Sequence, residues 1–173
     1  MTTFQTTLNH VQTFGQTKAE WQDFFQSEMN EHKAVAQKVQ EQMFEDFYKL
    51  CQVCLTAIQK GHKIMFFGNG GSAADSQHLA TELTVRYKED RLPIAAIALT
   101  TDTSALTAIG NDYDFTHLFS RQIQALGQPG DVCIGITTSG KSPNVIKALT
   151  TAKAMGLVPA ALSGKDGGDL KGI

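Results

Sequence analysis

The feature of this sequence that most constrains its fold is an alternation, from His62 onward, of short apolar runs with segments of helical spacing. The apolar runs occupy residues 63–67, 94–99, 131–136 and 158–162, and the helical segments occupy residues 73–86, 104–110, 117–126 and 143–155. Strands that are apolar throughout and separated by helices are typical of a parallel sheet covered on both faces. The alternation therefore predicts an α/β fold, a three-layer sandwich with a doubly wound parallel sheet.

Two amphipathic helices, at about residues 18–40 and 43–60, are predicted ahead of the sheet. The second should end at Gly61, because glycine often follows the last residue of a helix. We assign residues 1–17 to an N-terminal arm and residues 18–173 to a single domain. The first helix has an aromatic stripe that includes Trp21 and Phe24, and aromatic residues are enriched in subunit interfaces. The stripe favours a homo-oligomer, with packing against the sheet as the alternative.

Composition and charge exclude several classes of partner. The formal net charge of −2 provides no general attraction to nucleic acid or to an anionic membrane. No apolar run is long enough to span a bilayer, and the N-terminus lacks the basic and apolar regions of a signal peptide. The three cysteines are an odd number, which favours reduced thiols. We therefore expect a cytoplasmic protein that binds neither nucleic acid nor membrane.

The first loop of interest, residues 68–72, has the sequence Gly-Asn-Gly-Gly-Ser and follows the first predicted strand. Its glycines allow a sharp turn with exposed amides, and a helix that begins after such a turn can bind an anion. Ser72 is expected to cap that helix, with Asp75 completing a capping box. The loop therefore predicts either a plain helix start or a phosphate site.

The second loop, residues 137–142, follows the third predicted strand and has hydroxyls on Thr137, Thr138, Ser139 and Ser142. Pro143 suits the first turn of a helix, for which Ser142 is the expected cap. Hydroxyls and helix amides together can hold a phosphate without an arginine. Residues 135–142 also match the P-loop pattern of nucleotide hydrolases. We disfavour that interpretation because no following strand ends in an acidic metal ligand, although Asp102 after an earlier strand is a possible substitute.

The helix after the first loop has Asp75, His78 and Glu82 at spacings that put all three on one face. His78 and Glu82, one turn apart, can bind a metal together or act as acid and base. The alternative is a solvated polar face with a local ion pair. Asn111 and Asp112 are expected in a turn between two helices.

Four segments in order, residues 68–87, 110–112, 135–142 and 164–168, together resemble the phosphoheptose isomerases of the sugar isomerase (SIS) domain superfamily. The resemblance extends from about Trp21 to the end of the chain. It implies the SIS fold and conversion of sedoheptulose 7-phosphate to D-glycero-D-manno-heptose 7-phosphate, a step toward bacterial lipopolysaccharide. It also implies a homotetramer with active sites between subunits and one zinc ion in each site.

The resemblance further implies a role for individual residues. Glu82 would be the catalytic base, and His78 and Glu82 would bind zinc. The family's other zinc ligands are a glutamine and a histidine on a C-terminal helix, which this sequence, ending at Ile173, does not include. A non-catalytic SIS regulator that binds a sugar phosphate or a replication initiator is the alternative. The implied substrate-binding residues are Asn69, Gly70, Gly71, Ser72, Glu82, Asn111, Asp112, Thr137, Thr138, Ser139 and Ser142.

Overall fold

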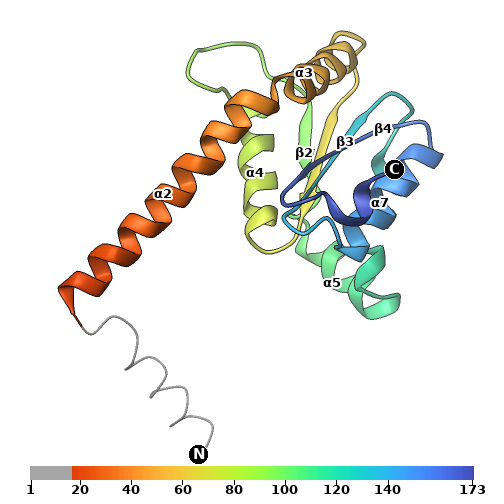
Figure 1. Cartoon of the computed structure of the whole chain (residues 1–173). Helices are drawn as coiled ribbons and strands as arrows, with labels where there is room; N and C mark the ends of the chain where they lie inside the picture. The colour runs from red at the N-terminus through yellow and green to blue at the C-terminus, as the bar shows by residue number, and fades with distance from the viewer. Residues whose placement is uncertain (1–16) are drawn as a thin grey trace, which may run out of the picture. The chain divides into compact units, whose positions relative to one another are not determined.

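The computed structural model describes residues 17–173, so the predicted arm at residues 1–17 lies outside the described chain except for Thr17. The chain forms two compact units, residues 1–48 and residues 49–173. In the first unit, helix α2 spans Lys18–Gln42 (Figure 1). It begins at a capping box, in which Thr17 Oγ1 accepts from the Glu20 amide and the Glu20 carboxylate accepts from the Thr17 amide. None of the α2 residues is buried.

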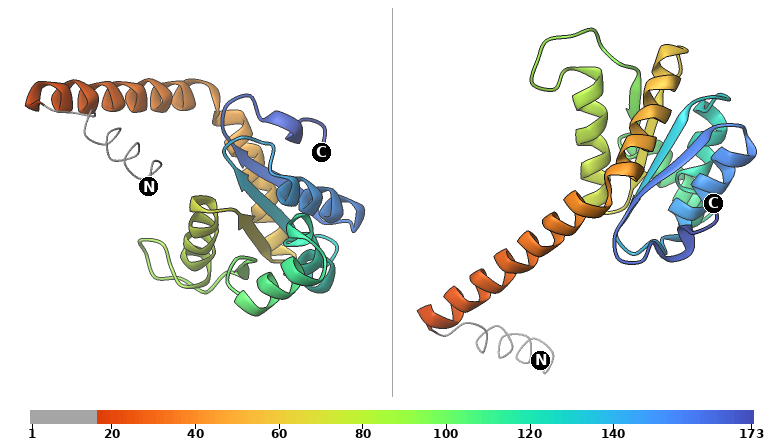
Figure 2. Two further views of the ribbon diagram at one scale, coloured as in Figure 1. Left: turned by 90° about the horizontal axis from the view of Figure 1, so that it is seen from below. Right: turned by 45° about the horizontal axis from the view of Figure 1, so that its top comes forward.

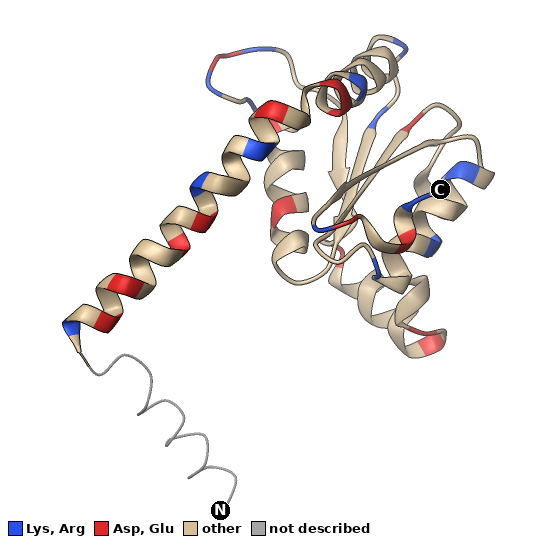
Figure 3. Cartoon of the chain, in the orientation of Figure 1, with Lys and Arg blue, Asp and Glu red and all other residues tan. Residues whose placement is uncertain are grey.

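Charged residues of both signs occur along α2 (Figure 3). A helix that binds a polyanion has a basic stripe instead. The expectation that nucleic acid is not a partner stays a prediction. Among residues 17–173, no helix is both long enough and apolar enough to cross a bilayer.

Helix α3 (Phe44–Gln59) ends where the sequence predicts. Gly61 has a φ of +80°, and the amides of Gly61 and His62 donate to the carbonyls of Ile58 and Ala57. These two bonds form a Schellman ending, which requires a residue that tolerates the left-handed region. The chain then turns directly into the first strand.

The second unit contains one parallel sheet, as the alternation of apolar runs predicted. Its strands are β1 (Ile64–Gly68), β2 (Ala96–Ala98), β3 (Val132–Thr137) and β4 (Val158–Ser163), in the spatial order β2-β1-β3-β4. The connecting elements are α4 (Gly71–Thr84), α5 (Thr103–Asp112), the 3-10 turn η1 (Phe115–His117), α6 (Ser120–Leu126) and α7 (Pro143–Ala154), and the turn η2 (Gly168–Leu170) follows β4.

Helices cover both faces of this sheet, which confirms the three-layer sandwich (Figures 1 and 2). Along β1, Met65 and Phe67 point to a core shared with α6 and α7, whereas Ile64 and Phe66 point to a core shared with α3 and α4. Successive strand residues alternate between the faces, so a strand buried on both must be apolar throughout. This requirement accounts for the apolar runs of β1 and β3, whose residues are all buried, whereas the edge strands β2 and β4 are partly exposed.

The strand order places a topological switch point between β1 and β3. After β1 the chain forms β2 on one side, and it later returns to form β3 on the other side. Gly68 and Ile136 are paired in the register, so the first loop (residues 68–72) and the second loop (residues 137–142) leave the sheet next to each other. In sheets of this kind, ligands bind beyond the carboxyl ends of the strands at such a point.

At the opposite end, a partly buried ion pair joins Lys63, just before β1, to Asp131, just before β3. Asp131 accepts from the Lys63 amide, the Lys63 ammonium and the Gln128 amide. Burial favours the neutral carboxyl, but the hydrogen bonds from Lys63 and Gln128 outweigh it and hold the pKa of Asp131 below its usual range. Cys133, two residues after Asp131, is buried, and desolvation raises the pKa of its thiol to about 12. All three cysteines are free thiols, as the odd count predicted.

Candidate functional site

The first loop starts helix α4 through its backbone alone. Gly70, with a φ of +56°, is the N-cap, and no side-chain hydrogen bond caps this N-terminal end among the described residues. The prediction that Ser72 caps the helix with Asp75 is therefore wrong. Gly70 can adopt the positive φ that turns the chain two residues earlier, so Ser72 lies inside the first turn and its amide donates to the Asn69 carbonyl at 3.0 Å.

This helix start has free space in front of it. A Cβ atom built on Gly70 or Gly71 would meet nothing within 4 Å, whereas one built on Gly68 would lie 2.7 Å from the carbonyl oxygen of Ile136. The first amides of a helix have no intrahelical acceptor, and the helix dipole favours negative charge there. The loop can therefore accept an anion beside Gly70 and Gly71.

The second loop presents hydroxyls in a fixed arrangement. Thr137 is buried, and its Oγ1 lies 3.0 Å from the Oγ of Ser142. Ser139 Oγ accepts from the Lys141 amide at 3.2 Å, and Thr138 is exposed. Ser142 occupies the N-cap of α7 with Pro143 following, as predicted, but its hydroxyl contacts Thr137 and does not bond a helix amide. A hydroxyl that does not cap the helix is available to a phosphate.

The segment after β4 packs directly on the second loop. Gly140 has a φ of +65°, and a Cβ atom there would lie 2.1 Å from the carbonyl oxygen of Gly167. The Asp169 amide donates to the Gly140 carbonyl at 3.0 Å, and Ser163 Oγ donates to the Thr137 carbonyl at 3.0 Å. These contacts hold the backbone of the second loop before any ligand binds.

The two loops are joined by a pair of asparagines. Asn69 Nδ2 donates to Asn144 Oδ1 at 2.9 Å, and Asn144 Nδ2 donates to Asn69 Oδ1 at 2.8 Å. Asn69 was predicted from the resemblance, but Asn144 was not. Its only sequence signal is an amide side chain two residues after the serine-rich loop, and nothing in the sequence pairs it with a residue 75 positions earlier.

On α4, His78 and Glu82 form the pair that their spacing predicted. His78 Nε2 lies 3.6 Å from Glu82 Oε1, with the side chains 73% and 30% exposed. Arg91 donates to the backbone carbonyls of Glu82 and Leu83, which holds the end of α4. Asp75 is exposed and makes no hydrogen bond to either of the other two among the described residues. Residues 17–173 contain no group of three or more His, Cys, Asp or Glu side chains that could bind a metal.

Asn111 and Asp112 lie on a helix and not in a turn. They are the last two residues of α5, so the predicted turn at this position is wrong, because the helical hydrogen bonds continue to the Tyr113 amide. Asn111 Nδ2 donates to Asp112 Oδ1 at 2.8 Å, and neither side chain bonds the first or second loop within the described part of the chain. Their predicted contact with sugar stays a prediction.

The structure gives Asp102 a structural role. Asp102 is the N-cap of α5, and its carboxylate accepts from the Ala105 amide at 2.9 Å. An acidic residue that orders the magnesium of a P-loop enzyme has its carboxylate directed to the metal. The match of residues 135–142 to a P-loop therefore lacks its acidic partner at Asp102.

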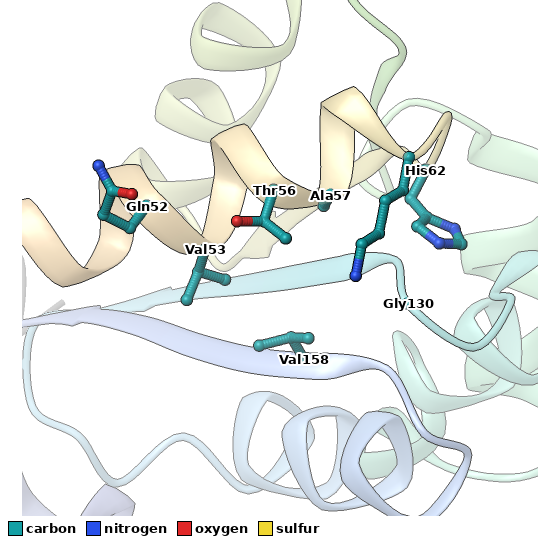
Figure 4. Close-up of a pocket in the computed structure, with 8 residues that line it drawn as sticks. Gln52, Val53, Thr56, Ala57, His62, Gly130 and Val158 are labelled. Atoms are coloured by element: carbon teal, nitrogen blue, oxygen red, sulfur yellow. The ribbon is translucent and has the colours of Figure 1, made fainter.

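A cavity of about 330 Å³ lies at the other end of the sheet (Figure 4). Its lining includes His62 before β1, Gly130 before β3 and Val158 at the start of β4, which are all at the amino ends of strands. None of the predicted site residues lines it. The candidate site is therefore the pair of loops at the carboxyl ends.

Known proteins are similar to this chain over most of its length. Residues 29–164 match the SIS domain family model. The chain is 53% identical over 150 residues to a phosphoheptose isomerase of Paramagnetospirillum magneticum, which covers 87% of this chain and 78% of the relative. It is 52% identical over 143 residues to a phosphoheptose isomerase of Campylobacter jejuni. This match covers 83% of this chain and 76% of the relative.

Two solved structures agree with these sequence matches. The phosphoheptose isomerase of Neisseria gonorrhoeae superposes with a TM-score of 0.82 at 44% identity, covering 87% of this chain and 78% of that one. The phosphoheptose isomerase of Francisella tularensis superposes with a TM-score of 0.83 at 31% identity, covering 86% and 78%.

Proposed function

The chain belongs to the phosphoheptose isomerases of the SIS domain family, and on that premise we propose that it converts sedoheptulose 7-phosphate to D-glycero-D-manno-heptose 7-phosphate. The observation that supports this most directly is the switch point, where a hydroxyl-lined loop meets the start of the helix that bears Glu82. One loop suits a phosphate, and the helix supplies a base.

The second loop binds the phosphate in this proposal. Ser139 and one hydroxyl of the Thr137–Ser142 pair donate to the phosphate, because the other proton of the pair is used in their own hydrogen bond. The helix starts at α7 and α4 add positive potential. Thr138 is the exposed member of the set. Binding energy from the phosphate then fixes the open-chain carbons beside the base, as remote binding energy does in other enzymes.

Glu82 is the base that moves the proton. Its carboxylate removes a proton from C1 of the ketose, O2 is protonated to give an enediol, O1 loses its proton, and Glu82 returns a proton to C2. No oxidant or reductant is needed, since the two carbons exchange oxidation states. The sugar hydroxyls contact Asn111 and Asp112 in this proposal.

The length of α4 suits a long substrate. Glu82 follows Gly71 by 11 residues on the same helix, so its Cα lies roughly 16 Å along the axis at about 1.5 Å per residue. Helical side chains lean toward the N-terminus, which shortens that gap by a few ångströms. An extended seven-carbon sugar phosphate spans on the order of 10 Å from C1 to phosphorus, from bonds of about 1.5 Å. A three-carbon sugar phosphate is too short to connect both ends.

Zinc is part of the proposal, with His78 and Glu82 as two of its ligands. A catalytic zinc site takes three protein ligands, and residues 17–173 offer no group of three, so these residues fit only part of such a site. No step above depends on a metal. Bound zinc would polarise a sugar oxygen. Replacing His78 by alanine is expected to lower zinc content, measured by atomic absorption.

We also propose a homotetramer with sites between subunits. The support is the first unit, in which Trp21, Phe24 and Phe25 are 49%, 44% and 63% exposed on a helix without buried residues. Exposed aromatic surface of this kind marks protein interfaces. The proposed setting is the cytoplasm, in heptose synthesis for bacterial lipopolysaccharide. Light scattering of the protein measures the assembly directly.

The experiment that tests the reaction is incubation of the protein with sedoheptulose 7-phosphate, with and without a chelator, followed by NMR of the sugar. We expect a new aldose signal, and in D₂O the exchange of solvent deuterium into C2. Ribulose 5-phosphate, two carbons shorter, should react at least about 100-fold more slowly, because truncated substrates lose kcat. Binding of sedoheptulose 7-phosphate without any turnover would contradict the proposal.

A further inference from the structure

We propose that Asn144 is a positioning residue, which holds the first and second loops in one fixed relation. Its side chain lies at the start of α7, directly after the second loop, and bonds Asn69 across the switch point. The expected effect on kcat rests on the proposed function. The contact between Asn69 and Asn144 does not.

Only one orientation of the Asn69 and Asn144 side-chain amides satisfies all of their hydrogen bonds. The Val145 amide donates to Asn144 Oδ1 at 3.0 Å, which fixes which end of the Asn144 amide is the oxygen. Asn69 must then present its nitrogen to that oxygen and its own oxygen to Asn144 Nδ2. Two antiparallel hydrogen bonds restrict both the distance and the twist between the residues, which a single bond would not do.

Burial makes the pair hard to break. Asn144 is only 2% exposed, and Asn69 is partly exposed. Polar groups sheltered from water are costly to leave without a partner, so the state with both bonds formed is strongly favoured. In the part of the chain that the structure describes, no other side-chain hydrogen bond joins the first loop or α4 to the second loop or α7.

This link matters because the two loops have different tasks. The phosphate binds to the second loop, and Glu82 extends from the helix that the first loop begins. The relation between the loops therefore sets where the reacting carbons lie relative to the carboxylate. The pair also occupies the oxygen and one N–H of Asn69, so its side chain has one N–H left for substrate.

The test compares Asn144→Ser with wild type. Serine keeps a side chain suited to a helix start but is too short to form both bonds to Asn69. We expect kcat for sedoheptulose 7-phosphate to fall about 30-fold or more, since small misplacement of reacting groups has effects of this order. The Kd of inorganic phosphate, which needs the second loop only, should change by less than about 3-fold.

A matched control is Ser76→Ala. It removes a buried hydrogen bond, from Ser76 Oγ to the Ser72 carbonyl at 2.7 Å, in the first turn of α4 but leaves the asparagine pair intact. Its kcat should stay within about 3-fold of wild type. If Asn144→Ser does not fold, Asn144→Asp serves as the second variant, because it has the same size and opposes the Asn69 oxygen with a second oxygen.

Two kinetic outcomes would overturn the inference. One is wild-type kcat in a folded Asn144→Ser protein. The other is an equal loss of kcat and of phosphate affinity, which would indicate collapse of the second loop. If the wild type does not turn over sedoheptulose 7-phosphate, the proposed function fails separately. The hydrogen-bonded pair of Asn69 and Asn144 is then tested alone, by ¹⁵N NMR of the Asn69 side-chain amide. The protection of this amide from hydrogen exchange should be lost in Asn144→Ser, and unchanged protection would refute the pairing.

Discussion

The first and second loops occupy equivalent places at the ends of neighbouring parallel strands, yet they are built in different ways. The first has open space at Gly70 and Gly71 and starts its helix without a side-chain cap, and Asn69 is its side-chain link to the start of α7. The second buries Thr137, orders its hydroxyls and is covered by the segment after β4. The difference is consistent with the proposed division of roles, in which the second loop would bind the phosphate and the first begins the helix that bears the proposed base, Glu82.

The largest expected effect is that of Glu82→Gln. This change lies on α4, the helix that begins at the first loop, and leaves the second loop unchanged. General acid–base catalysis contributes about 10²–10⁴-fold, so kcat should fall by at least about 10²-fold. The Kd of sedoheptulose 7-phosphate, measured by calorimetry, should change little because the second loop is intact. Wild-type turnover in this variant would refute the role of Glu82 as the base.

The complementary change is the double variant Ser139→Ala with Ser142→Ala, which alters the second loop only. Hydrogen bonds to charged groups contribute about 1.5–3 kcal/mol each, so phosphate affinity should fall on the order of 100-fold. Thr150→Ala, which removes an exposed hydroxyl of α7 that bonds the Ile146 carbonyl, is the matched control. An unchanged Kd in the double variant would remove the second loop from the proposal.

Glycine substitutions compare how tightly each loop is held. Gly140→Ala combines a positive φ with a contact of 2.1 Å, whereas Gly70→Ala has a positive φ but open space. Strain at such residues is about 1–3 kcal/mol, so Gly70→Ala should cost that much and Gly140→Ala more. Urea unfolding measures both. Equal losses would show that the packing of Gly167 on the second loop contributes nothing.

The smallest effect concerns the far ends of β1 and β3, where Lys63 and Asp131 meet. The folded pKa of Asp131 lies below its usual range, so its ionised form stabilises the fold above the ordinary aspartate pKa of about 4. That contribution is lost as the pH falls through the folded pKa. The melting temperature of wild type should therefore fall more between pH 5 and pH 3 than that of Asp131→Asn. Parallel pH profiles for the two proteins would contradict this assignment.

Local patterns predicted most of the fold. The four apolar runs predicted the strands β1 to β4. Burial on both faces accounts for the apolar runs of β1 and β3, whose residues are all buried, whereas β2 and β4 at the edges of the sheet are partly exposed. Gly61 and Pro143 marked a helix end and a helix start, because their backbone preferences act within a turn. The cap at Ser72 was wrong for the same local reason, since Gly70 can turn the chain earlier than a serine cap requires.

The site was predicted in part. His78 and Glu82 were found because they are one turn apart on one helix. Asn144 was missed because its partner is distant in sequence, and hydrogen bonds across a sheet leave no periodic signal. The position of Asn111 and Asp112 at the end of α5 was also missed, since Gly110 suggested an earlier end to that helix.

The sequence by itself determined the α/β class, the positions of the first and second loops, and the acid–base candidates His78 and Glu82. Each of these depends on spacing within a few residues. Only the tertiary structure decided the strand order β2-β1-β3-β4, and with it the meeting of the two loops and of Asn69 with Asn144. Strand order depends on pairing between residues such as Val132 and Val158, or Ile64 and Val132, which are far apart in the sequence. Apolar runs of similar composition do not specify their neighbours.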